Sequence, residues 1–227
     1  MSTTTERRTT TIRGALLAGA SAPAVFIPLD LADGLLRPGY SIARHWVSHL
    51  ALGEWGWLGT TLLGVTAVLV GTGALGLLAA LRRRGGRIAT AVALLVAAVG
   101  LAIAAAFPMD PSLGFPVGVP EGAPSVAGLI HQAAGPVFIV GSAIALLTAP
   151  RSLRSIGLSA SAAAFRTAGI AALVFFALCS VLVSLDYAGA WTEAPSGLAE
   201  RLAIGIGLLG AAVVAFRVRR ATTDDRT

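Results

Sequence analysis

The sequence contains no lysine, and all 17 of its basic residues are arginines. A phosphate-binding loop of the nucleotide-hydrolysing kind needs a lysine after its glycines, so nucleotide-driven chemistry within this chain is excluded. Cysteine occurs once, which rules out an intrachain disulfide and any metal site built from several cysteines. Charged residues make up 12% of the chain, against about 25% in soluble domains, and 56% are hydrophobic. These deficits exclude a soluble scaffold and predict an integral membrane protein.

Six stretches are apolar enough, and close enough to the required length of about 20 residues, to cross a membrane as helices. The first is the weakest, because Pro23 and Pro28 interrupt it. Its arginine-rich start resembles a secretory signal peptide, but cleavage would leave Pro23 at the start of the mature chain, so we expect an uncleaved helix. We predict an all-α fold, one membrane domain of six transmembrane helices with polar, disordered ends at 1–11 and 221–227. The predicted spans are 14–31, 57–81, 88–107, 126–149, 167–187 and 200–216.

The arginines fall very unevenly on the two sides of such a bundle. Fourteen of the 17 lie on the side of the termini, and Arg37, Arg44 and Arg201 lie on the other. Because basic loops stay in the cytoplasm, we predict the cytoplasmic (inner) membrane with both termini cytoplasmic. The net charge of +6 is therefore a topology signal rather than a nucleic-acid-binding one. The partners it predicts are membrane lipids, with anionic headgroups on the cytoplasmic face.

The most informative stretch is 40–57, which reads YSIARHWVSHLALGEWGW. As a helix over 41–52 it would place Ser41, His45, Ser48 and His49 on one face, opposite an apolar face. One interpretation is a short amphipathic helix at the outer interface, with the tryptophans of this stretch at headgroup level. The outer loop 108–125, with five prolines and three glycines, is expected to form an ordered cover.

A second interpretation of the same stretch is a metal site. His45 and His49 stand at i and i+4, a spacing that can bind zinc from one helical face. A catalytic zinc needs a third protein ligand, for which His131 and Asp110 are the candidates. The alternatives of an interfacial helix and a zinc site both stay open at the level of sequence.

Ionisable residues inside or at the ends of the spans are the other candidates. His131 lies inside the fourth span, either as a neutral histidine bonded between helices or as a proton-relay or ligand-binding group. Asp30 and Asp186 either form ion pairs with Arg44 or Arg201, or join Asp110 and His131 around an outer vestibule that takes a cation or substrate. Glu200 is interpreted as a favourable charge in the first turn of the last span.

Glycines crowd the second and last spans, which we interpret as close helix packing within one bundle rather than dimerisation. The sequence shows no internal repeat that would indicate an inverted-repeat transporter. Its oligomeric state is left open.

Three features together resemble the DUF998 family, bacterial and archaeal membrane proteins with about six helices and unknown function. They are YS-x2-R-x3-S (Tyr40, Ser41, Arg44 and Ser48), Phe107-Pro108 after the third span, and His131. A more distant similarity is to the CREST membrane hydrolases, since Ser41-x3-His45 and Asp110 fit part of their motif. Their late His-x3-His pair is absent here, and six helices replace seven.

The resemblance implies a fold but no catalytic residues. The first functional hypothesis is binding or transport of a small molecule, ion or lipid through an outer-facing polar vestibule, with no cofactor. The alternatives are a metal-dependent lipid hydrolase and a non-catalytic assembly or sensor subunit.

Overall fold

The computed structural model describes residues 2–224, and that part of the chain folds into six long α-helices and one short 3-10 helix. Each predicted span coincides with one of the long helices, with 88–107 exceeding its helix by one residue at each end, which confirms the all-α, six-helix fold. All six are long and apolar enough to cross a membrane. The helices are α1 (Ser2–Leu36), α2 (Gly56–Arg83), α3 (Ala89–Ala106), α4 (Val126–Arg154), α5 (Ala162–Tyr187) and α6 (Ser196–Asp224), and the 3-10 helix is η1 (Val47–Ala51).

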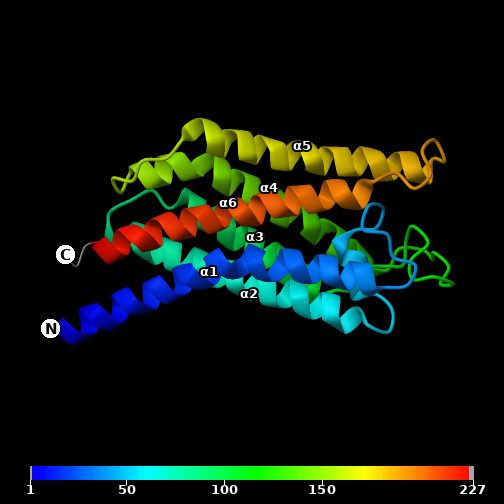
Figure 1. Ribbon diagram of the computed structural model, residues 1–227, viewed down its shortest axis with the longest axis horizontal. Helices are drawn as coiled ribbons and strands as arrows, with labels where there is room; N and C mark the ends of the chain where they lie inside the picture. Colours follow the sequence, from blue (N-terminus) through cyan, green and yellow to red (C-terminus); the bar gives the residue numbers. More distant parts are fainter. Residues whose placement is uncertain (1, 225–227) are drawn as a thin grey trace.

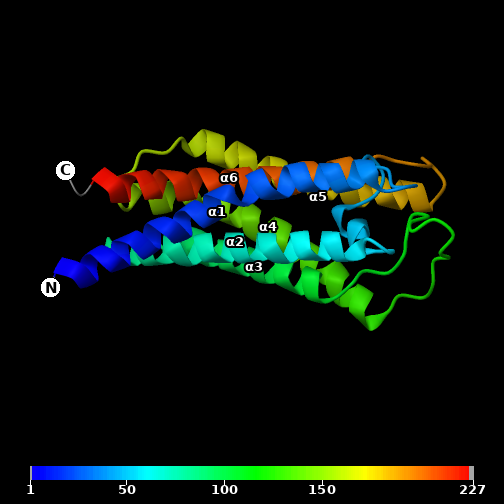
Figure 2. The same cartoon turned by 60° about the horizontal axis from the view of Figure 1, so that its bottom comes forward.

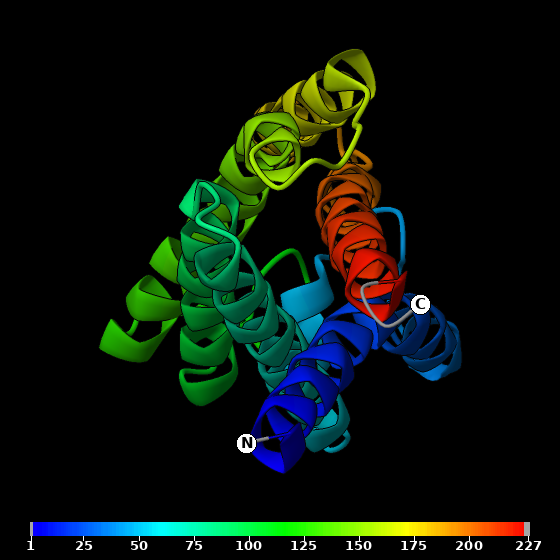
Figure 3. The ribbon, with the colours of Figure 1, turned by 90° about the vertical axis from the view of Figure 1, so that its left-hand side faces the viewer.

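The six helices form a closed ring, because each packs on its neighbour in sequence and α6 returns to pack on α1. Additional contacts of α6 with α4 and α2 join opposite sides of the ring. Figure 3 looks along the helices and shows η1, in light blue, within this ring. Both described ends of the chain lie at one end of the bundle (Figures 1 and 2). We call the opposite end, where connections 37–55, 108–125 and 188–195 lie, the distal end.

Glycines set the closest helix contacts. The Cα atoms of Gly19 and Gly73 lie against each other where α1 crosses α2, and a Cβ on either would collide with the partner's backbone. On α6, Gly207 packs on Ser142 and Gly210 packs on Leu146, both from α4. Small residues allow this close approach. Within a membrane the hydrophobic effect does not drive helices together, so their association depends on such close packing. The predicted use of glycine for packing within one bundle is confirmed at Gly73, Gly207 and Gly210, and Gly19 of α1 adds a contact that was not predicted.

The faces turned away from the ring are apolar. Large side chains such as Val68 on α2 and Val181 on α5 are 66% and 55% exposed. A soluble protein rarely presents so many of them, whereas lipid solvates them well. The fold is therefore that of a multi-pass membrane protein.

The ends of the bundle correct one prediction. Residues 2–11 and 221–224 were expected to be disordered, but α1 and α6 extend through them. Adding residues to a helix that already exists costs little, because only nucleation is strongly unfavourable. Residues 1 and 225–227 of the predicted ends lie outside the described residues. Pro23 and Pro28 do not end α1 either.

The predicted helix over 41–52 is only partly correct. Residues 42–44 form turns, and the helix is limited to the five residues of η1. It does not lie at the interface, since His49 and Leu50 on it are fully buried. Trp55 and Trp57 are more than half exposed at the distal end, but Trp46 turns inward.

Candidate functional site: a polar cluster and cavity at the distal end

Residues 40–51, which we call the inserted segment, enter the distal end of the ring and are bonded to it on several sides. Its backbone runs beside the start of α6, where the N–H groups of Gly197 and Leu198 donate to the carbonyls of Arg44 and Ala43. Gly197 has to be glycine here, because a Cβ would overlap the carbonyl oxygen of His45. Backbone hydrogen bonds thus anchor the segment to the start of α6. They require the two backbones to approach closely, but they do not require particular side chains.

Arg201 of α6 is the centre of the polar cluster. Its side chain is 8% exposed and donates to Asp30 of α1 through Nε and Nη2, with Nε 2.8 Å from Oδ2 and Nη2 3.2 Å from Oδ1. Nη1 donates to the carbonyls of Ile42 and His45, at 2.9 and 2.7 Å, and Nη2 donates to the Tyr40 hydroxyl. A single guanidinium therefore ties α1, α6 and the inserted segment together. Burial raises the pKa of the Tyr40 phenol, which stays neutral.

Two further arginines complete the anchoring. Arg44 binds Asp186 at the end of α5 through two bonds of 2.7 and 2.9 Å. This bond to Asp186 raises the pKa of Arg44 above its ordinary value. Arg37 binds Asp33 and also donates to the carbonyls of Leu50 and Leu52. The ion-pairing alternative for Asp30 and Asp186 is thus what the structure shows, and neither carboxylate faces a vestibule as a free group.

Both ring nitrogens of His45 and His49 have backbone partners, and Nε2 of His49 also lies 2.8 Å from the hydroxyl of Ser112. In each, Nδ1 accepts from a backbone N–H, that of Ser41 for His45 and that of Trp46 for His49. In each, Nε2 lies 3.1 Å from a carbonyl oxygen of the loop 108–125, from Leu113 and Ser112 respectively. Because a carbonyl only accepts, both rings are neutral with the proton on Nε2. Their hydrogen bonds hold the first half of the loop 108–125 against the inserted segment, whereas residues 117–125 are exposed.

Burial controls the ionisation of these two histidines. It lowers the pKa of His45 below its ordinary value, against a smaller opposite effect of the Leu113 carbonyl. It lowers the pKa of His49 to about 3, with the nearby His45 adding to the effect. Both nitrogens of each ring are already engaged, so neither offers a lone pair to a metal in this arrangement.

The rings of His45 and His49 lie side by side, with centroids 5.3 Å apart, but the structure does not bring a third candidate zinc ligand to them. Among residues 2–224 no group of three or more His, Cys, Asp and Glu side chains could hold a metal ion. Asp110 instead accepts from the backbone N–H of Ser125 at 2.9 Å, beside the start of α4, and packs over Gly128. Hydrogen bonds from the side chain and backbone of Ser125 lower the pKa of Asp110. This is a capping role, separate from the histidines.

His131 has a different bonding pattern from the other two histidines. Its Nδ1 lies 2.7 Å from the carbonyl oxygen of Phe107, so the proton is on Nδ1. Its Nε2 is then an acceptor, and it lies 2.7 Å from the hydroxyl of Ser48, which donates. The neutral histidine bonded between elements, one of the two alternatives from the sequence, matches this geometry. The pairing with Ser48 was not predicted.

The Ser48–His131 pair borders a cavity of about 320 Å³ between α4, α5 and α6. Trp46 and Ser48 of the inserted segment line it at one side, and Glu200 enters from α6. Its walls mix apolar side chains with hydroxyl, imidazole and amide groups, the composition typical of small-molecule sites. The remaining lining residues are Met109, Gln132, Gly135, Pro136, Ile139, Phe176, Cys179, Ser180, Val183 and Ser184.

The sequence interpretation of Glu200 as a charge in the first turn of its helix was wrong. Since α6 begins at Ser196, Glu200 is past the first turn and does not cap its own helix. Its Oε2 accepts instead from the backbone N–H of Val47 at 2.7 Å. Among the described residues no arginine forms an ion pair with it, unlike Asp30, Asp33 and Asp186. The position of Glu200, an acidic residue just inside a predicted span, was the sequence signal that could have identified it as a cavity residue.

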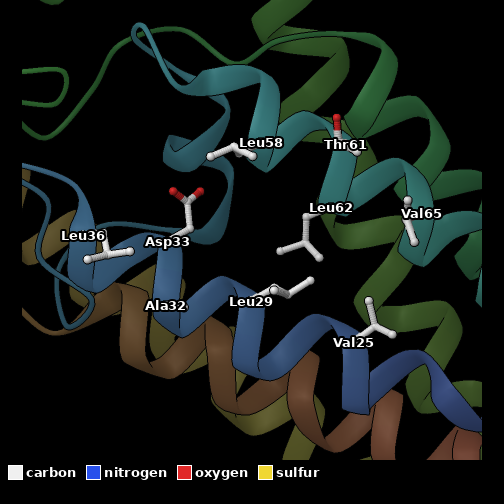
Figure 4. A pocket seen from close by; sticks show the side chains of 9 residues that line it. All are labelled: Val25, Leu29, Ala32, Asp33, Leu36, Leu58, Thr61, Leu62 and Val65. Atoms are coloured by element: carbon white, nitrogen blue, oxygen red, sulfur yellow. The ribbon is translucent and has the colours of Figure 1, made fainter.

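A second cavity of about 310 Å³ lies between the distal halves of α1 and α2 (Figure 4). Its lining is apolar apart from Thr61 and Asp33, and Asp33 is already bound to Arg37. Leu29 and Leu36 on its rim are 53% and 82% exposed. It is a lipid-facing groove and carries no reactive group.

The fold and this cluster define a six-helix membrane protein with a partly open cavity of mixed polar and apolar lining beside the inserted segment. The chain belongs to the DUF998 family, described as a protein of unknown function, whose family model matches residues 20–217. No match was found among curated proteins or among solved structures.

Proposed function

We propose that this protein binds a small amphipathic molecule that carries a positive charge, in the cavity between α4, α5 and α6. The observation that carries the proposal is Glu200. The three aspartates of the cluster are each bound to an arginine, but Glu200 lines the cavity without such a partner. A cation binds favourably next to a carboxylate in a largely apolar site, because such surroundings screen the attraction between the two charges poorly.

The rest of the lining suits the same ligand. Trp46 and Phe176 border the cavity, and aromatic faces attract organic cations. Glu200 carries the only carboxyl group of the lining, and no arginine lines the cavity. The cavity volume of about 320 Å³ is at the lower end for small-molecule sites, which favours a compact ligand.

The test is a binding titration of benzyltrimethylammonium against its uncharged isostere neopentylbenzene, with the protein in lipid nanodiscs. We expect Glu200→Gln to weaken binding of the cation about tenfold or more, since hydrogen bonds and contacts to charged groups contribute about 1.5–3 kcal/mol. Binding of the neutral isostere should change little. Glu54→Gln is the matched control, because Glu54 is exposed and lies outside the cavity. Equal affinity of wild type and Glu200→Gln for the cation would refute the proposal.

We also propose that the protein resides in the bacterial cytoplasmic membrane with both termini cytoplasmic. The positions of the arginines support this orientation, as does the location of both described chain ends at one end of the bundle (Figure 1). The distal cavity then opens toward the outer leaflet, and the arginines near the termini contact anionic headgroups. Reporter fusions at the C-terminus and within 188–195 test the orientation, and a periplasmic C-terminus would overturn it.

A further inference from the structure

His131 differs from the other two histidines in the partner of its unprotonated ring nitrogen. In His45 and His49 the unprotonated nitrogen accepts from a backbone N–H. In His131 the unprotonated nitrogen accepts from a hydroxyl, that of Ser48, and both residues line the cavity. The opposite nitrogen is held by the Phe107 carbonyl at 2.7 Å, which fixes the tautomer and the ring orientation.

This arrangement is the one that activates a serine. A nucleophilic hydroxyl requires a base within hydrogen-bond distance and a third group that orients the base. Here the third group is a backbone carbonyl rather than a carboxylate. Ser48 is only half-buried, so its hydroxyl is accessible from the cavity.

We propose that Ser48 and His131 are the nucleophile and general base of an acyl-transfer site that hydrolyses esters within the cavity. The Ser48 oxygen attacks the ester carbonyl carbon while its proton moves to Nε2 of His131. The bond from carbon to the alcohol oxygen then breaks, and the imidazolium returns the proton to the departing alcohol. Water, with His131 again as base, cleaves the acyl-serine to a carboxylic acid and restores the hydroxyl. The side-chain amide of Gln132, also on the cavity wall, is the donor for the oxyanion.

The preferred substrate is an ester whose alcohol carries a positive charge, and this part of the inference rests on the proposed function. Glu200 would hold the cationic group while Ser48 attacks the carbonyl. The acyl-transfer chemistry itself does not depend on Glu200. Separate experiments can therefore refute the acyl-transfer site and the binding of a cation by Glu200.

A fluorophosphonate probe tests the chemistry, because an activated serine displaces its fluoride and keeps the phosphorus. Peptide mapping of the labelled wild-type protein in nanodiscs is expected to place the adduct on Ser48. Ser48→Ala should abolish labelling, and His131→Gln should slow it at least a hundredfold, the usual contribution of a general base. Ser41→Ala is the control, since Ser41 lies on the same segment, outside the cavity, and stands four residues before a histidine. No adduct, or an adduct only elsewhere, would overturn the proposal even if a variant failed to fold.

Hydrolysis of acetylthiocholine and of its uncharged isostere, 3,3-dimethylbutyl thioacetate, tests the substrate class. The wild type is expected to prefer the cationic thioester about tenfold, and Glu200→Gln should remove the preference while labelling of Ser48 persists. Labelling of Ser48 without any preference would retain the acyl-transfer site and refute the cationic substrate.

Discussion

Replacement of Arg201 by methionine is the most direct test of how the distal end is held together. Methionine keeps much of the side-chain volume but removes the charge, which leaves the carboxylate of Asp30 3% exposed and without its partner. It also removes the donor from the carbonyls of Ile42 and His45. Loss of one partner of a buried ion pair costs about 3–5 kcal/mol. For a chain of this size each kcal/mol lowers the melting temperature by about 2–4 °C, so a fall of about 10 °C is expected.

The assay is thermal unfolding followed by circular dichroism in nanodiscs of fixed lipid composition and concentration. Arg44→Met is the comparison, and a smaller loss is expected because Arg44 is 25% exposed and forms its ion pair with Asp186 alone. Asp30→Leu combined with Arg201→Met should regain part of the loss, since no charge then remains buried. If Arg201→Met melts within about 2 °C of wild type, or if the double variant is no more stable than the single one, the assigned role of the ion pair is refuted.

Two other perturbations follow from the same geometry. The folded pKa of His49 is about 3, below its ordinary 6.5, so stability should be highest above pH 6.5 and fall as the pH drops toward 3. At pH 4.5 the free energy of unfolding is lower by about 3 kcal/mol, because His49 binds a proton in the unfolded chain but not in the folded chain. Melting at pH 7.5 and 4.5 checks this, and an equally steep decline in His49→Gln would contradict it. Gly197→Ala should destabilise the fold, because its Cβ would overlap the carbonyl of His45, whereas Gly205→Ala, with open space around it, should not. Equal melting temperatures of these two variants would argue against the close approach.

The six spans could be predicted because the membrane imposes simple conditions on each segment separately. A stretch must be long and apolar enough, and its backbone must bond to itself, whatever lies beside it. Glycine-rich stretches also indicated where helices approach closely, as at Gly73. Helix ends were less predictable, because α1 continues into polar residues that no span rule covers.

The inserted segment shows why sequence periodicity led to the wrong prediction of a helix over 41–52. A pattern with His45 and His49 four residues apart fits one face of an α-helix, yet His45 lies in a bend and His49 in a 3-10 helix. Bonds from Arg201 and α6 to the segment's carbonyls compete with helical bonds and replace them. Such long-range bonding leaves no local signal in the sequence.

By itself, the sequence determined that the chain is a six-helix membrane protein with histidines and most of its acidic residues toward one end. It also named the two arginines that neutralise Asp30 and Asp186. Only the tertiary structure decided which partner each group has: Arg201 for Asp30, the backbone for His45 and His49, and a hydroxyl 83 positions away for His131. The reason is that local spacing sets which residues share an element. The packing of α4, α6 and the inserted segment sets which polar groups are left facing the cavity.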